Sequence, residues 1–218
     1  RLGTLYGSDK GQLADISAKV KNAQQLWQKQ RDADCAMCFW GEALATGPNI
    51  NVTVKGKAIM SPADRKAAYA AAHPQEFCVG IDLITHRVER SVRKQTLGKL
   101  DNVIFLKAEA TEFLEALPTA VVLRKIFILY PDPWPKKKHH KNRFIQATSL
   151  NLLAQRAAAG ARLHFRTDDA DYFEWTRTHL AEHATWNLQT ETTWPFEQTT
   201  FFEERMTAKR DLEAERVP

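Results

Sequence analysis

Apolar residues along the chain follow two spacings that alternate from residue 50 to residue 183. Short runs rich in β-branched and aromatic residues predict strands, and they cover 50–54, 76–83, 102–106, 126–129 and 162–166. Helices are predicted between and after these strands: over 61–72 from a Ser-Pro start, over 85–97 with Gly98 after its end, over 111–117, over 144–159 from apolar residues at helical spacing, and over 172–183 after a cap at 167–169. Because strands and helices alternate, the sequence predicts βαβ units, an α/β fold and a mostly parallel sheet.

The two ends of the chain follow other patterns. Residues 1–12 are polar and rich in glycine, and we expect a mobile N-terminal arm there, followed by a single domain over 13–218. Leu13 to Gln30 has an apolar side and predicts an amphipathic helix. Near the C-terminus, alternation over 186–188 and again over 192–202 predicts an antiparallel C-terminal strand pair.

The loop over 130–143, between a predicted strand and a predicted helix, combines stiffness with charge. Three prolines within five residues fix their φ angles and make this loop stiff. The loop also carries Asp132, Trp134, two histidines and five Lys/Arg residues. Ligands of open α/β sheets bind beyond the carboxyl ends of the strands, so a carboxylate beside a cationic run predicts an active site that faces a polyanion. On charge pattern alone, a solvated face or a localisation signal explains the cations equally well.

Two motifs in this loop resemble a family signature. They are Pro-Asp-Pro-Trp-Pro-Lys at 131–136 and Lys-His-His-Lys-Asn-Arg at 138–143, and together they resemble the signature of the tRNA (guanine-N7)-methyltransferase family. The resemblance implies a Rossmann-like, doubly wound sheet, S-adenosylmethionine as the cofactor and tRNA as the partner. It also implies methyl transfer to N7 of a guanosine in the tRNA variable loop.

The resemblance also implies roles for individual residues. Asp82 ends a predicted strand, where nucleotide-binding sheets place a carboxylate on ribose hydroxyls, and the resemblance assigns it the ribose of S-adenosylmethionine. Glu109 matches the family acid that accepts a hydrogen bond from the adenine amino group. Asp132 is implied both as the catalytic residue and as a cofactor-binding residue. The implied substrate-binding residues are Lys136, Asp168, Thr200 and Glu203.

These residue types suit methylation at N7. Guanine N7 carries a free lone pair, so alignment and charge stabilisation matter more than a general base. Because the methylated base is cationic, a carboxylate such as Asp132 would stabilise the transition state. Lys137, Lys138, Lys141 and Arg143 would neutralise tRNA phosphates.

Structural interpretations compete with these roles. Asp82 and Glu109 could be solvent-exposed loop acids, and Asp168 could be the N-cap of the helix that follows it. Trp134 could stack on a base or anchor the loop by packing. The two histidines at 139 and 140 have no partner at ligand spacing, so no metal site is expected.

One segment departs from the family pattern. The family's first strand ends in an acid followed by a glycine-rich turn, and the corresponding segment here, counted back from Asp82, is 54–63. That segment has no Gly-x-Gly pair, and the place of the acid falls near Lys57. Side chains where glycine is needed obstruct the close approach of a cofactor. The alternative function is therefore a catalytically impaired tRNA-binding relative with a degraded methyl-donor loop.

Charge, hydropathy and cysteines limit the class of protein. The net charge of +5 and the pI of about 9.1 permit nucleic-acid binding without requiring it. No apolar run approaches the ~20 residues of a membrane helix and no signal-peptide pattern opens the chain, so we expect a cytoplasmic protein without a membrane partner. The cysteines at 35, 38 and 78 predict reduced structural thiols. The sequence leaves monomer and homodimer open.

Overall fold

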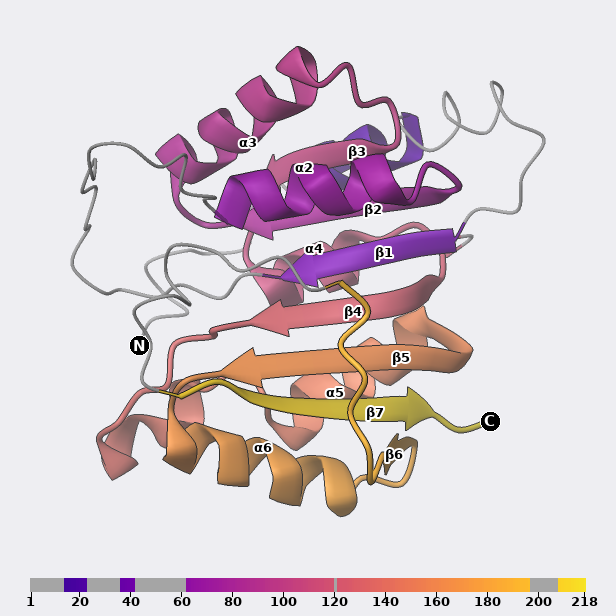
Figure 1. Ribbon diagram of the computed structural model, residues 1–218. Coiled ribbons are helices and arrows are strands. Elements are labelled where there is room, and N and C mark those ends of the chain that lie inside the picture. The colour runs from indigo at the N-terminus through magenta and orange to yellow at the C-terminus, as the bar shows by residue number, and fades with distance from the viewer. Residues whose placement is uncertain (1–13, 23–35, 42–61, 120, 197–207) are drawn as a thin grey trace.

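Seven strands form one sheet in the computed structural model, which describes residues 14–22, 36–41, 62–119, 121–196 and 208–218 (Figure 1). The strands are β1 Ala36–Gly41, β2 Glu76–Asp82, β3 Val103–Lys107, β4 Leu123–Leu129, β5 Ala157–Thr167, β6 Trp186–Leu188 and β7 Arg210–Arg216. The helices are α2 Pro62–Ala72, α3 Thr85–Leu97, α4 Ala110–Ala116, the 3₁₀-helix η1 Lys137–Asn142, α5 Ala147–Arg156 and α6 Ala170–Ala181. Residues 14–22 are also helical, within the predicted helix over 13–30.

The strand order is β3-β2-β1-β4-β5-β7-β6. Strands β1 to β5 run parallel, and β7 lies antiparallel between β5 and β6. The order therefore reverses between β1 and β4, as in other doubly wound sheets, where ligands bind at this reversal. The predicted α/β class, the mostly parallel sheet and the antiparallel C-terminal strand pair are confirmed.

Two strands of the sheet come from segments in which the sequence pattern predicted no strand. The strand between β2 and β4 is β1, Ala36–Gly41, whereas the predicted strand over 50–54 lies outside the described residues. The partner of β6 is β7, Arg210–Arg216, and not a strand over 192–202. The described part of that segment, up to residue 196, has no strand structure. The predicted arm over 1–12 also lies outside the described residues.

Cross-strand charge pairing explains why β7 was missed. Its acids Asp211, Glu213 and Glu215 stand opposite Arg166, His164 and Arg162 of β5. Arg166 Nε lies 2.6 Å from Asp211 Oδ1, and Arg162 lies 3.0 Å from both Glu213 and Glu215. A sequence as charged as this one is unfavourable for a strand by itself, and the facing arginines compensate its charges.

The boundary between α5 and β5 also differs from the prediction. The predicted helix over 144–159 ends at Arg156, because the chain then enters a β5 longer than the predicted 162–166. A bulge interrupts the pairing of β5 with β4, since Leu123 pairs with Ala157 but Lys125 pairs with Arg162. Gly160 lies in this bulge with a φ of 75°, a conformation that glycine adopts without a steric penalty.

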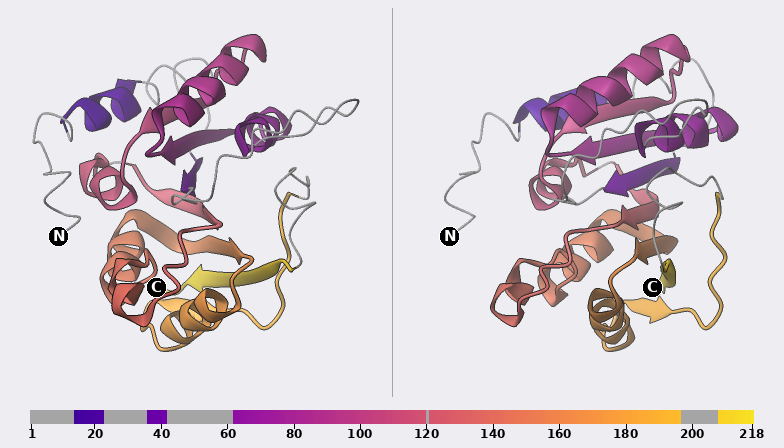
Figure 2. Two further views of the ribbon diagram at one scale, coloured as in Figure 1. Left: turned by 90° about the vertical axis from the view of Figure 1, so that its left-hand side faces the viewer. Right: turned by 60° about the vertical axis from the view of Figure 1, so that its left-hand side comes forward.

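Different elements cover the two faces of the sheet. Helices α4, α5 and α6 and the helical residues 14–22 pack on one face, through side chains such as Ile16, Phe113 and Leu150. The other face carries α2, α3 and the extended segment 189–196, which we call the strap (Figures 1 and 2). Figure 1 shows the strap crossing β7, β5 and β4. In the described part of the chain, no helix is long and apolar enough to cross a membrane.

Candidate functional site

The acids predicted for the site follow neighbouring parallel strands at one edge of the sheet. Asp82 ends β2, and Glu109 comes two residues after β3. Asp132 follows β4, and Asp168 follows β5. The arrowheads of these strands in Figure 1 point to the side on which η1 lies. Because carboxyl ends of parallel strands share an edge, the fold brings the four acids to the same side.

Asp82 is a buried acid, with 4% of its surface exposed. Its Oδ1 accepts a hydrogen bond of 2.8 Å from the backbone N–H of Ile84, and its Oδ2 lies 3.8 Å from Arg87 Nη1. The backbone N–H of Ala108 donates to the carbonyl of Asp82 at 3.2 Å, which joins the ends of β2 and β3. The alternative of a solvent-exposed loop acid is therefore wrong for Asp82. Arg87, in the first turn of α3 five residues after Asp82, was not predicted as part of the site.

Glu109 is the N-cap of α4. Its Oε2 accepts hydrogen bonds from the backbone N–H groups of Thr111 at 2.7 Å and Glu112 at 3.0 Å. The side chain is only partly exposed. Capping satisfies backbone donors that would otherwise lack partners and fixes the direction of the carboxylate. The role of Glu109 at the adenine amino group stays a prediction, and any such contact would be shared with the cap.

The loop that carries Asp132 is strained on both sides of the acid. Tyr130 and Trp134 have positive φ angles of 48° and 45°, a conformation that costs about 1–3 kcal/mol for residues other than glycine. The backbone N–H of Tyr130 donates to the carbonyl of Arg166 at 2.7 Å, which ties the loop to β5. Asp132 itself is half-buried. Strain of this kind persists where the surrounding structure enforces it and is common at functional sites.

The cations of the loop divide into two groups. Lys136, Lys137, Lys138 and Lys141 are exposed on and beside η1 and are available to phosphates. Arg143 is buried, with 2% of its surface exposed. Its predicted contact with tRNA phosphates is therefore wrong, because the guanidinium faces the protein interior.

The aromatic and histidine side chains of the loop pack on their neighbours. Trp134 is half-buried and contacts His139 edge to face, with ring centroids 5.8 Å apart. His140 Nε2 lies 3.6 Å from Asp171 Oδ2. No three His, Cys, Asp or Glu side chains of the described residues gather closely enough to hold a metal ion.

Asp168 is not the helix cap. The cap of α6 is Asp169, whose Oδ1 accepts a hydrogen bond of 2.7 Å from the backbone N–H of Tyr172. The Asp168 side chain is exposed, while its carbonyl accepts a hydrogen bond of 2.8 Å from Arg210 Nη1. The capping interpretation of Asp168 is wrong, and its carboxylate stays accessible to a ligand. Thr200 and Glu203, the other predicted substrate residues, lie outside the described residues.

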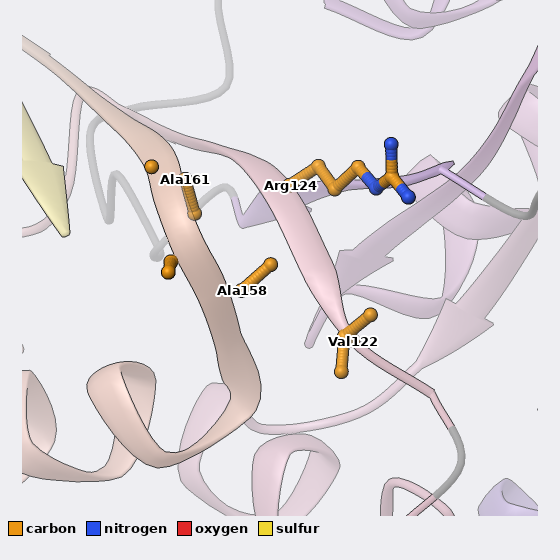
Figure 3. Close-up of a pocket in the computed structure, with 6 residues that line it drawn as sticks. Val122, Arg124, Ala158 and Ala161 are labelled. Carbon is orange, nitrogen blue, oxygen red and sulfur yellow. The ribbon is translucent and has the colours of Figure 1, made fainter. Parts of the chain in front are cut away.

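A shallow depression lies away from these acids. Figure 3 shows it at the amino ends of β4 and β5, lined by Val122, Arg124 and residues 158–161 of the bulge. It carries a single charged side chain, that of Arg124. None of the predicted site acids among the described residues lines this depression.

The position of β1 changes the interpretation of the methyl-donor segment. The acid sought after the first strand was assigned near Lys57 by counting back from Asp82. The first strand among the described residues is β1, Ala36–Gly41, which lies between β2 and β4, and the residue that follows it in the sequence is Glu42. The charge reversal at Lys57 therefore no longer argues against a methyl donor. Residues 42–61, which include most of the 54–63 segment, lie outside the described part.

Comparisons with known proteins agree with this architecture. A family model described as "Putative methyltransferase" matches residues 63–214. A tRNA (guanine-N(7)-)-methyltransferase from Rhodospirillum rubrum is 33% identical over 153 residues, which cover 69% of this chain and 59% of that protein. Another from Thiobacillus denitrificans is 40% identical over 108 residues, which cover 50% of this chain and 48% of that protein. The chain thus spans about half the length of the curated relatives it matches.

Solved structures share the fold at low sequence identity. The 16S rRNA methyltransferase KamB aligns with a TM-score of 0.55 and 14% identity, over 92% of this chain and 94% of that chain. A 16S rRNA (adenine(1408)-N(1))-methyltransferase from Catenulisporales acidiphilia, solved with SAM, aligns with a TM-score of 0.51 and 20% identity, over 89% of this chain and 92% of that chain. With the family model matching most of the chain, the chain belongs to the methyltransferase family of its tRNA (guanine-N7)-methyltransferase relatives.

Proposed function

We propose that this protein transfers a methyl group from S-adenosylmethionine to N7 of a guanosine in tRNA. The observation that carries the proposal is Asp132, which a strained, proline-framed loop holds half-buried at the carboxyl end of β4. The exposed lysines of η1 lie directly beside this loop. A fixed carboxylate next to a cationic surface suits a base that becomes cationic while its backbone is polyanionic. The names of the relatives support tRNA as the substrate and guanine N7 as the methylated atom. The cytoplasm is the expected compartment.

The residues at the ends of β2 and β3 suit a nucleoside. Asp82 is buried with one oxygen held by the Ile84 N–H, and it can accept hydrogen bonds from ribose hydroxyls. Glu109 Oε2 caps α4, and its Oε1, which accepts a hydrogen bond of 3.3 Å from the Thr111 hydroxyl, can also accept from an amino group. When bound, S-adenosylmethionine supplies an electrophilic methyl group on a sulfonium. The strand ends therefore provide the acceptors that an adenosine group requires.

Asp132 acts on charge and not on a proton. The N7 lone pair attacks without losing a proton, and positive charge develops on the purine as the bond forms. A carboxylate held in a half-buried loop stabilises this charge more strongly than water would, because its orientation is already fixed. The hydrogen bonds that hold this loop in its strained conformation, from the Tyr130 N–H and from Arg143 Nε, fit this demand, since they limit the movement of the carboxylate. Removing one such electrostatic contribution typically costs about 10²–10³-fold in rate.

Asp168 and the lysines deal with the rest of the substrate. Guanine presents its N1–H and N2–H donors on its pairing edge, and the exposed carboxylate of Asp168 can accept them. Lys136, Lys137, Lys138 and Lys141 can neutralise phosphates, which gives affinity that falls as salt rises. Asp168 would therefore recognise the base, while the lysines would hold the strand.

The alternative is an impaired relative that binds tRNA without methylating it. The experiment that decides is incubation of the full chain with labelled S-adenosylmethionine and unmodified tRNA, followed by nucleoside analysis. We expect labelled 7-methylguanosine at one position in the variable loop. Retained tRNA binding without any 7-methylguanosine would support the impaired relative. Loss of both would reject the tRNA assignment itself.

A further inference from the structure

Arg143 is a fully buried cation that no step of the proposed reaction uses. Its side chain is 0% exposed and lies between the Asp132 loop and α6. Burying an ion costs several kcal/mol unless partners compensate the lost hydration. A buried arginine next to a strained acidic loop therefore requires a structural or functional explanation from its partners.

The first partner is the Asp132 loop. Arg143 Nε donates a hydrogen bond of 2.8 Å to the carbonyl of Pro133. Pro133 stands between Asp132 and Trp134, whose φ of 45° is one of the strained angles of the loop. The hydrogen bond thus fixes the peptide between Pro133 and Trp134, one residue beyond Asp132.

The second partner is the first turn of α6. Arg143 Nη2 donates to Asp171 Oδ2 at 2.5 Å, and the guanidinium lies 4.9 Å from the ring centroid of Tyr172 and 5.1 Å from that of Trp175. Asp171 follows Asp168 by three residues, across the Asp169 cap. The guanidinium therefore also fixes the first turn of the helix that begins directly after Asp168 and its neighbour, the Asp169 cap.

Further hydrogen bonds hold the chain just after Arg143 against the same helix. The backbone N–H of Ile145 donates to the Tyr172 hydroxyl at 3.1 Å, and Trp175 Nε1 donates to the carbonyl of Ile145 at 2.7 Å. Since Tyr172 is buried, these contacts leave Arg143 little freedom to move relative to α6. The connection between the Asp132 loop and α6 is accordingly short and rigid.

We propose that Arg143 is a positioning residue that sets the separation between the carboxylates of Asp132 and Asp168. One guanidinium holds the loop after β4 by one nitrogen and the helix after β5 by another. Its effect on catalysis rests on the proposed function. There, Asp132 stabilises the positive charge that develops on the guanine, and Asp168 accepts hydrogen bonds from the pairing edge of the same guanine. Small displacements matter in such a site, since a misplacement of about 1 Å can reduce a rate about 100-fold.

The test uses three variants and one control in the full chain. Arg143→Met removes the hydrogen bonds to Pro133 and to Asp171. Arg143→Lys keeps the charge, but one ammonium group cannot reproduce the two separately directed nitrogens. Asp171→Asn weakens the hydrogen bond to α6 at an exposed carboxylate. The matched control is Arg177→Met, which removes an exposed arginine of α6 that pairs with Glu174. Each is measured by hydrogen–deuterium exchange of residues 130–136, by thermal unfolding, and by kcat and KM for tRNA.

We expect faster exchange of residues 130–136 in Arg143→Met and Arg143→Lys but not in Arg177→Met. Asp171→Asn should show a smaller increase in exchange. We expect kcat to fall about 100-fold for Arg143→Met and less for Arg143→Lys and Asp171→Asn, with KM for tRNA changed less than about threefold. A purely structural arginine would lower the melting temperature and leave kcat of the folded fraction intact, which would overturn the proposal.

Hydrogen–deuterium exchange tests the positioning role of Arg143 independently of the proposed methyl transfer. If the unsubstituted protein forms no 7-methylguanosine, the proposed function fails, and the exchange of residues 130–136 still reports whether Arg143 holds the loop. Unchanged exchange in Arg143→Met would reject the positioning role whatever the activity. If Arg143→Met does not fold, Arg143→Lys and Asp171→Asn decide by the exchange of residues 130–136 and by kcat.

Discussion

Arg166 of β5 lies with its guanidinium carbon 3.7 Å from the ring centroid of Trp194 in the strap. Asp211 of β7 binds the same guanidinium through two hydrogen bonds of 2.6 and 2.8 Å. The backbone carbonyl of Arg166 accepts the hydrogen bond from Tyr130 at the start of the Asp132 loop. One buried arginine thus connects the strap, the C-terminal strand and the candidate catalytic loop.

Next to Arg166 on the same face, His164 lies in an aromatic enclosure. Its ring stacks on Phe127 with centroids 5.0 Å apart, and the Trp194 ring lies 5.7 Å away, edge to face. Burial, and then the charges of Lys125, Arg162 and Arg166, lower the pKa of His164 to about 4. The carboxylate of Glu213 favours the protonated imidazole, but its Oε2 lies 4.0 Å from His164 Nδ1, beyond hydrogen-bond distance. Because burial and three nearby cations outweigh this single carboxylate, the imidazole is neutral in the folded protein near neutral pH.

This histidine should make the fold sensitive to acid. A folded pKa below the unfolded value of about 6.5 means that the unfolded chain binds the extra proton. Its stability contribution is complete above pH 6.5 and is lost as the pH falls towards 4, by about 2 kcal/mol at pH 5. Urea unfolding of the wild type and of His164→Phe at pH 7.5 and pH 5 should show a smaller acid-dependent loss in the variant. Equal losses in the two proteins would contradict the prediction.

The charge on Asp132 should matter for catalysis more than for tRNA binding. We expect Asp132→Asn to lower kcat about 10²–10³-fold, because the amide cannot stabilise the cationic purine. The dissociation constant for tRNA should stay within about twofold, since the loop keeps its shape. Steady-state methylation and filter binding measure the two quantities. Glu174→Gln on the exposed side of α6 is the control for loss of one negative charge. If tRNA affinity and kcat fell together in Asp132→Asn, Asp132 would be a folding or RNA-binding residue.

The lysines of η1 should control the salt dependence of tRNA binding. Each phosphate contact contributes about 0.7–0.9 to the slope of log K against log salt concentration. The double variant Lys137→Gln/Lys138→Gln should therefore bind more weakly and show a slope smaller by about 1.5. Binding titrations at several salt concentrations give the slope. The control is Arg93→Gln/Lys94→Gln, which removes two positive charges from the exposed surface of α3. If the α3 variant changes the slope and the η1 variant does not, the RNA surface lies on α3.

Asp82 should control the affinity for the methyl donor. Asp82→Asn keeps the size of this buried side chain but weakens its hydrogen bonds to ribose hydroxyls. Hydrogen bonds to charged groups are worth about 1.5–3 kcal/mol, so S-adenosylmethionine should bind about 10–100-fold more weakly. Calorimetry measures this, with Glu89→Gln on the exposed face of α3 as the control. Unchanged donor affinity, with the variant folded, would remove Asp82 from the donor site.

The sequence by itself determined the parts of the fold that local pattern encodes. The strands β2 and β3 lie within one residue of their predicted bounds, because their own apolar residues favour a buried strand. The stiff loop after β4 was also visible, since proline fixes φ without help from the rest of the chain. Asp82 and Asp132 could therefore be placed at strand ends before any contact was known.

Only the tertiary structure decided the features that depend on residues distant in the sequence. β7 is a strand because arginines some 45–55 positions earlier neutralise its acids. Arg143 is buried because Asp171, Tyr172 and Trp175 surround it, although its local sequence is that of an exposed cationic run. Charge and polarity give the cost of burial, but only the folded chain supplies the partners that compensate it.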